Sequence, residues 1–265
     1  MYSITSVTPT ICSLMGIKAP IESTAPTIDV VVSYASKILR GGLAEKALVY
    51  APDAIGLGIR RDYANLFAGV EKAAPIEVEM KSVLPTYTPV CFSSMFTGAQ
   101  PEVHGIRKYE KPVLTCDTIF DALLREGKEA AIIAVKNSSI DLVFRNRKID
   151  YFTEEYDPQV EASTLKILDV ADYDFILVYH QEYDDLMHAS TPRDPNAIEA
   201  FKRHLRSFET LASAFNARYK SSNRVVAFTP DHGTHIDPDT GKGAHGTDSP
   251  EDVNVRHFWG VYRGG

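Results

Sequence analysis

Histidine and aspartate residues gather in two segments of the sequence. The first contains Asp184 and His188, whose spacing lets one helical turn place a carboxylate and an imidazole on the same face. The second contains the adjacent pair Asp231-His232 and, after a short loop, His245 between glycines. Mixed oxygen and nitrogen ligands suit zinc or a similar divalent ion. An exposed Asp–His ion pair and solvated loop histidines are the alternative interpretation of the same residues.

Asp53 and Thr88 are two further candidates for a catalytic or ligand-binding role. Asp53 lies just beyond an apolar run, although an aspartate there is commonly a turn or a helix cap. Thr88 followed by Pro89 predicts a helix that begins with Thr88 as N-cap. A hydroxyl in the positive field of a helix N-terminus suits attack on a phosphate. The alternative is an ordinary cap.

Short apolar runs alternate with amphipathic stretches along the chain. The runs predict strands at Ala47–Ala51, Ala130–Val135, Phe175–Tyr179, Val225–Thr229 and Phe258–Tyr262. Helical periodicity is clearest at Thr118–Arg125, Glu161–Ala171 and Ala197–Tyr219. This alternation predicts an α/β fold with a mostly parallel central sheet and helices on both faces.

The polar segments Glu182–Asn196 and Asp231–Asn254 each follow a predicted strand. Ligands of open α/β sheets bind at the carboxyl ends of strands, so the histidines and aspartates of both segments are expected near a binding crevice. The chain of 265 residues, 44% hydrophobic, fits one large domain at residues 1–265. Because only a short loop separates His232 from His245, we expect little or no cap domain.

Composition narrows the class of protein. The net charge of −7 and a pI near 5.6 leave no basic footprint for nucleic acid and no polybasic segment for anionic membrane. The sequence has three cysteines and no C-x-x-C pair. We therefore expect neither a disulfide framework nor a zinc site with thiolate ligands. The first residues lack a signal-peptide pattern, and no apolar run approaches a membrane span, so the expected location is the cytoplasm.

Taken in order, these segments resemble the alkaline-phosphatase superfamily, closest to its type I phosphodiesterase/nucleotide pyrophosphatase branch. The similarity spans Asp53 to His245 and lies in an early aspartate after a strand and in five motifs: Pro85-Thr-Tyr-Thr88, Thr97-Gly-Ala-Gln-Pro-Glu-Val-His-Gly-Ile106, Asp184…His188, Asp231-His232-Gly233 and Gly243-Ala-His245-Gly246. The ordered set is more specific than any one of its motifs.

The resemblance implies an alkaline-phosphatase-like fold and a hydrolase that cleaves small-molecule phosphate esters, as a phosphodiesterase, nucleotide pyrophosphatase or phosphatase. It implies two divalent metal ions, zinc or alternatively manganese. One would be held by Asp184, His188 and His245. The other would be held by Asp53, Asp231 and His232, with Thr88 as its further ligand and as the nucleophile of a phosphothreonine intermediate. His104 matches the family's His-Gly-Ile segment but is not a ligand there, so we expect it to be structural.

The chain departs from the family pattern after His104. Where nucleotide pyrophosphatases carry an asparagine that contacts a phosphoryl oxygen, this sequence has Tyr109, preceded by Arg107 and Lys108. If these three residues bind substrate, the cationic pair would favour a doubly charged monoester over a singly charged diester. A phosphomutase or phosphonate hydrolase on the same metal cage is the alternative activity, and a catalytically silent binding module is the non-enzyme alternative.

The N-terminal segment is unusual in its position. Ser6–Pro20 resembles a segment that in many relatives follows the last catalytic histidine. The fold is therefore expected to be circularly permuted, with residues Met1–Leu43 packed beside the final strand.

Overall fold

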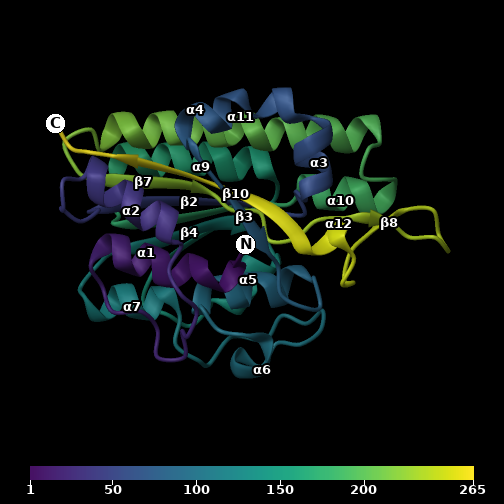
Figure 1. Cartoon of the computed structure of the whole chain (residues 1–265), viewed down its shortest axis with the longest axis horizontal. Coiled ribbons are helices and arrows are strands. Elements are labelled where there is room, and N and C mark those ends of the chain that lie inside the picture. The colour runs from purple at the N-terminus through teal and green to yellow at the C-terminus, as the bar shows by residue number, and fades with distance from the viewer.

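A computed structural model describes all 265 residues, and an eight-stranded sheet forms its centre (Figure 1). The strands lie in the order β1 (Tyr2–Ser3), β3 (Ile76–Lys81), β10 (Asn254–Tyr262), β7 (Arg224–Phe228), β2 (Lys46–Pro52), β6 (Phe175–His180), β4 (Ala130–Val135) and β5 (Asp150–Glu154). Only β10 is antiparallel to its neighbours. The predicted, mostly parallel sheet is confirmed. A separate hairpin pairs β8 (His235–Ile236) with β9 (Gly243–Ala244).

Helices cover both faces of the sheet, as predicted (Figure 1). One face carries α1 (Val7–Met15), α2 (Asp29–Ile38), α5 (Thr88–Thr97), α7 (Ile119–Arg125) and α8 (Ser139–Val143). The other carries α3 (Leu57–Asp62), α4 (Ala68–Ala73), α9 (Asp157–Val170), α10 (Glu182–Ala189) and α11 (Pro195–Arg218). The short helices are η1 (Ile4–Ser6), η2 (Ala64–Phe67), α6 (Pro101–His104) and α12 (Pro250–Val253).

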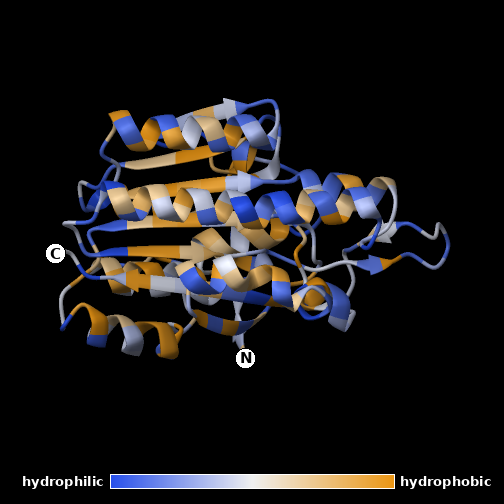
Figure 2. Ribbon diagram, turned by 90° about the horizontal axis from the view of Figure 1, so that it is seen from above, coloured by the Kyte–Doolittle hydropathy of each residue, from blue (hydrophilic) through white to orange (hydrophobic).

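The two faces bury separate apolar clusters because side chains alternate along each strand. In β2, Val49 points into one cluster, whereas Leu48 and Tyr50 point into the other. Figure 2 shows the apolar strands between helices whose outer sides are polar. Strands buried on both faces read as continuous apolar runs, which is why the central strands could be predicted from sequence.

Several strands differ from the prediction, which lacks β1, β5 and the β8–β9 hairpin. Two further differences concern β10 and β3. The last strand starts at Asn254, four residues before the predicted Phe258, and runs antiparallel. Strand β3 is absent from the prediction, although its buried Ile76, Val78 and Met80 alternate with charged residues. Such alternation marks a strand near a sheet edge, with one face buried and one exposed.

The N-terminal segment packs on the sheet. Tyr2 pairs with Met80 of β3, α1 contacts α5 and α7, and α2 contacts β10. The packing of this segment beside the final strand agrees with the expected permutation. However, the termini are not adjacent: the chain begins where β10 starts and ends beyond its far end, where Gly265 bonds to Lys220. The permutation stays a prediction. No helix is both long and apolar enough to cross a membrane.

Candidate active site

Three buried ligand-type side chains meet at the carboxyl ends of β2 and β7. Asp53 follows β2, and the Asp231-His232 pair follows β7, its parallel neighbour. The Nε2 atom of His232 lies 3.4 Å from Asp53 Oδ1 and 3.3 Å from Asp231 Oδ2. The side chains of all three are at most 2% exposed. Parallel pairing of β2 and β7 therefore brings together residues far apart in sequence.

A second group lies beside the first, nearer the solvent. Asp184 and His188 are four residues apart on α10, and His245 follows β9. Asp184 Oδ1 is 3.5 Å from the Nε2 atoms of both His188 and His245. His188 is 43% exposed, so this group is the one that solutes reach first. The rings of His245 and His232 stack with centroids 4.0 Å apart, which joins the two groups.

Each of the three histidines is oriented by a backbone carbonyl. Nδ1 of His232 bonds to Gly233 O at 3.1 Å, that of His188 to Gly243 O at 3.0 Å, and that of His245 to Thr86 O at 2.6 Å. A carbonyl can only accept, so Nδ1 carries the proton and Nε2 presents a lone pair. Three lone pairs thus face carboxylate oxygens, an arrangement that suits a shared cation.

The spacing of these atoms fits tetrahedral metal coordination. Zinc with ligands at about 2.0–2.1 Å separates neighbouring ligand atoms by about 3.3–3.4 Å. The measured separations are 3.3–3.5 Å in both groups. Asp231 Oδ2 and Asp184 Oδ1 are buried and have no hydrogen-bond partner. The donor set and its unpartnered oxygens fit a metal ion in each group.

The electrostatics agree with this fit. Burial, and then the charge of Asp184, raises the pKa of Asp53 well above its ordinary value. Burial, and then the charge of Asp53, does the same to the pKa of Asp231. Burial, and then the charge of Asp231, raises the pKa of Asp184. Burial, and then the neighbouring imidazole of His188, lowers the pKa of His245 to about 4. Buried carboxylates that repel one another and imidazoles held neutral are the state that a divalent cation stabilises.

Thr88 lies against the buried group. Its Oγ1 is 3.4 Å from Asp53 Oδ1 and 3.3 Å from His232 Nε2. The predicted helix is present, but its N-cap is Tyr87 and Thr88 is its first residue, one position from the prediction. The hydroxyl therefore sits in the positive field at the start of α5, as the chemistry of phosphate attack requires.

Two glycines hold the ligand-bearing loops together. A Cβ on Gly233 would lie 2.0 Å from Glu251 O, and one on Gly56 would lie 2.6 Å from the Cα of Gly233. Only glycine permits this approach of the loops that follow β2 and β7.

Two tyrosines contact the site although the sequence did not identify them as site residues. The hydroxyl of Tyr179, near the end of β6, donates to Asp53 Oδ2. Tyr87 stacks edge-on with His245 at 5.8 Å and with Tyr109 at 6.1 Å. Tyr87 lies inside the Pro-Thr-Tyr-Thr motif and could have been selected for that reason, whereas Tyr179 reads from sequence as an ordinary core residue.

Of the three candidate substrate-binding residues after His104, two contact acceptors away from the site and one packs beside it. Arg107 donates to Glu102 O at 3.1 Å, and Lys108 pairs with Glu110 at 3.4 Å, so both cations are engaged with acceptors outside the two groups. Tyr109 instead packs against Tyr87, which in turn packs against His245 of the site. His104 bonds to Ser94 Oγ at 2.8 Å and lies in neither ligand group, which agrees with its expected structural role.

Comparison with known proteins supplies the family. Residues 73–248 match the family model of type I phosphodiesterase/nucleotide pyrophosphatase. The chain belongs to this family. A search of curated sequences gives no match. Several solved structures have a similar fold at low sequence identity.

One similar structure is murine ectonucleotide pyrophosphatase/phosphodiesterase 5, an inactive threonine-to-alanine variant in complex with AMP. The identity is 17% and the TM-score 0.57, over 72% of this chain and 58% of that one. Phosphonoacetate hydrolase from Sinorhizobium meliloti, in complex with phosphonoformate, has 19% identity and a TM-score of 0.54, over 75% and 59%. A 2-O GAG sulfatase has 12% identity and a TM-score of 0.58, over 84% and 64%. This chain thus spans about three fifths of the length of the first two of these proteins.

Proposed function

We propose that the chain is a metal-dependent phosphohydrolase that cleaves phosphodiesters through a phosphothreonine intermediate at Thr88. The observation that carries the proposal is the hydroxyl of Thr88 at 3.3–3.4 Å from two atoms of a ligand group whose spacing fits a metal. Membership of the phosphodiesterase family supports the reaction class. The adjacency of the second ligand group supports a two-metal site, with zinc as the ion that suits these ligands and manganese as the alternative.

Asp53, Asp231 and His232 would hold one ion, and Asp184, His188 and His245 the other. When bound, the ions would lower the pKa of the Thr88 hydroxyl and neutralise charge on the phosphoryl oxygens and the leaving oxygen. Thr88 Oγ1 forms a bond to phosphorus while the bond to the leaving oxygen breaks. Water then cleaves the phosphothreonine and restores the hydroxyl. The position of Thr88 at the N-terminus of α5, beside Asp53 and His232, supports this role for its hydroxyl.

The surroundings of the site favour a diester over a monoester. Arg107 and Lys108 contact Glu102 and Glu110, so neither is placed for a doubly charged phosphate. Tyr109 and Tyr87 form an aromatic pair beside His245. Flat aromatic faces suit a nucleobase or another aromatic substituent of the ester.

Metal analysis combined with turnover of paired substrates tests this function. We expect two equivalents of bound metal and faster hydrolysis of a bis-nitrophenyl phosphate diester than of the nitrophenyl monoester. Faster monoester turnover would contradict the diester preference. A protein that binds metal and cleaves only phosphonates would support the phosphonate-hydrolase alternative, and a metal-free protein would overturn the proposal.

Replacing Tyr109 should change substrate binding more than chemistry. In Tyr109→Ala we expect the KM for an aromatic diester to rise about fivefold with kcat changed less than about threefold, since a stacked aromatic contact contributes about 1 kcal/mol. Tyr109→Phe keeps the ring and should resemble the wild type. A kcat that falls while KM stays constant would place Tyr109 in the chemistry instead.

We also propose that residues 1–265 form a single domain without a cap. Both apolar clusters pack on the same sheet, which supports one cooperative unit.

A further inference from the structure

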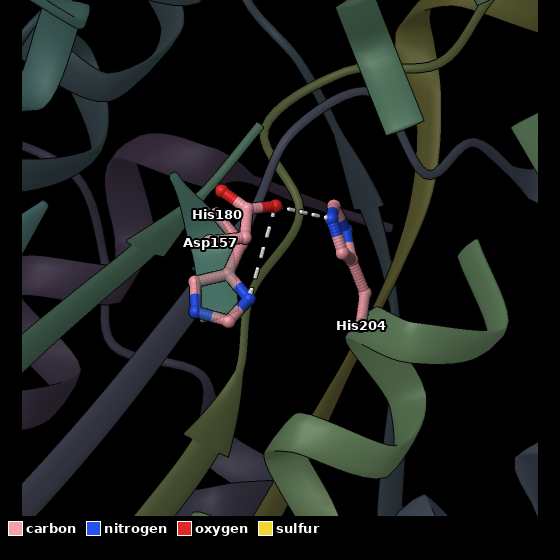
Figure 3. Close-up of side chains that lie close together, drawn as sticks. All are labelled: Asp157, His180 and His204. Atoms are coloured by element: carbon pink, nitrogen blue, oxygen red, sulfur yellow. Dashed lines mark hydrogen bonds and ion pairs between the residues drawn. The ribbon is translucent and has the colours of Figure 1, made fainter. Parts of the chain in front are cut away.

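A third cluster of ligand-type side chains lies outside the two groups of the site. It consists of Asp157 at the start of α9, His180 at the end of β6 and His204 in α11 (Figure 3). His204 Nε2 lies 2.9 Å from Asp157 Oδ2, and His180 Nδ1 lies 4.0 Å from the same oxygen. The Asp157 side chain is 6% exposed and those of the two histidines at most 1%. Nothing in the reaction proposed above uses these residues.

The geometry of this cluster is that of a hydrogen-bond network and differs from that of a metal site. The separations of 2.9 and 4.0 Å depart in both directions from the 3.3–3.5 Å found in the two groups of the site. His180 Nδ1 is already paired with the Tyr50 hydroxyl at 2.8 Å. His204 Nε2 donates to Asp157, since a carboxylate can only accept. The two ring nitrogens that face Asp157 are therefore engaged in hydrogen bonds, whereas the other ring nitrogens, His180 Nε2 and His204 Nδ1, are buried without a partner.

Asp157 has a second set of partners at the start of α10. Its Oδ1 accepts the backbone N–H of Gln181 at 3.1 Å, and its Oδ2 accepts that of Glu182 at 2.9 Å. These are the N-cap and first residue of α10, and Gln181 makes no side-chain cap of its own. The first N–H groups of a helix lack partners within the helix and favour an anion. Asp157 thus caps α10 from a different element of the chain.

Helix α10 carries two of the three residues of the solvent-side group. Asp184 lies two residues beyond the capped Glu182, and its Oδ1 faces both His188 and His245 at 3.5 Å. A shift of α10 would move Asp184 and His188 together relative to His245, which follows β9. We propose that Asp157, oriented by His204, is a positioning residue that sets the geometry of the Asp184–His188–His245 group. This inference rests on the proposed role of that group as a metal site.

The test is Asp157→Asn, titrated as metal-free protein with Zn²⁺ against a competing chelator. Asparagine keeps the size and one acceptor oxygen but loses the charge and the second acceptor. We expect the affinity of one metal site to fall ten- to a hundredfold and that of the other to stay unchanged, as for other partners that orient ligands. Saturating Zn²⁺ should restore kcat. His188→Ala, which removes a ligand of the solvent-side group, identifies which binding step is weakened.

Glu161→Gln is the matched control. Glu161 lies one turn further along α9 and bonds to Ser207 of α11, so it joins the same two helices without touching α10. Both metal affinities should match the wild type. His204→Ala is the second variant, which stands in if Asp157→Asn does not fold: it leaves both backbone contacts of Asp157 in place and should weaken the same site by a smaller factor.

Unchanged affinities in both Asp157→Asn and His204→Ala would overturn the inference. Equal losses at both sites would also overturn it, because they indicate a general loss of structure. A third metal equivalent that disappears in Asp157→Asn would identify the cluster as a metal site instead. Because affinity is measured without turnover, a wild type that binds two metals but hydrolyses nothing would refute only the proposed function.

Discussion

Thr88→Ala should lose at least about 10³-fold in kcat while both metal ions stay bound. The hydroxyl is the only nucleophile that the site places within 3.4 Å of Asp53 and His232, and loss of a covalent nucleophile typically costs about 10³–10⁶-fold. The six carboxylate and imidazole side chains that we propose as ligands are untouched, so metal content should equal that of the wild type. Steady-state kinetics with an aromatic diester and elemental analysis of the same samples make the comparison.

Thr88→Ser is the matched control, because it keeps the hydroxyl and removes a methyl group. We expect it to retain activity within about tenfold. Acid-quenched wild-type protein should yield a phosphorylated peptide that contains Thr88, and Thr88→Ala should yield none. Undiminished turnover in Thr88→Ala would overturn the phosphothreonine intermediate.

Asp231→Asn should have opposite effects on the metal-loaded and the metal-free protein. With metal, we expect weaker binding at the buried group and a fall in kcat of about 10³-fold, since the ion supplies several kcal/mol of transition-state stabilisation. Without metal, we expect the variant to be more stable than the wild type by at least about 1 kcal/mol. Asp231 is fully buried and repels Asp53, and an unpaired buried charge costs several kcal/mol. Steady-state kinetics of the metal-loaded protein and denaturant unfolding of the chelated protein measure the two changes.

The pH dependence of the metal-free protein follows from the same carboxylates. Their pKa values are raised in the folded state by burial and mutual repulsion, so the folded state binds more protons than the unfolded state. The stability that these carboxylates contribute is then fully present below their unfolded pKa of about 4. It is lost as pH rises through their raised folded-state values. Asp231→Asn should flatten this decline. The buried histidines, among them His232 and His245 with their lowered pKa values, have the opposite pH dependence, so the test compares the two proteins: equal pH slopes of stability in the wild type and in Asp231→Asn would contradict the assignment.

Much of the fold is encoded locally. Strands β2, β4, β6 and β7 are buried on both faces, so each appears as an unbroken apolar run, and α11 shows one apolar stripe along 24 residues. Strand β3 also has a local signal, because Ile76, Val78 and Met80 alternate with charged residues, but it lacks the unbroken apolar run on which the prediction of those strands depends. The antiparallel direction of β10 left no mark in the sequence, since an apolar strand reads the same in either direction.

The site, like the fold, has features that the sequence predicts and features that depend on the tertiary structure. The sequence by itself determined which residue types are present, the spacing of Asp184 and His188 on one helical face, and the order of motifs that indicates the family. Only the tertiary structure decided that Thr88 faces the Asp53 group, that Arg107 and Lys108 bond elsewhere, and that Asp157 caps α10. The contacts of Thr88 with Asp53 and of Asp157 with Glu182 join residues that the sequence separates and the sheet brings together, whereas those of Arg107 and Lys108 are local. Spacing fixes geometry within one helix or strand, whereas contacts between elements depend on how the whole sheet packs.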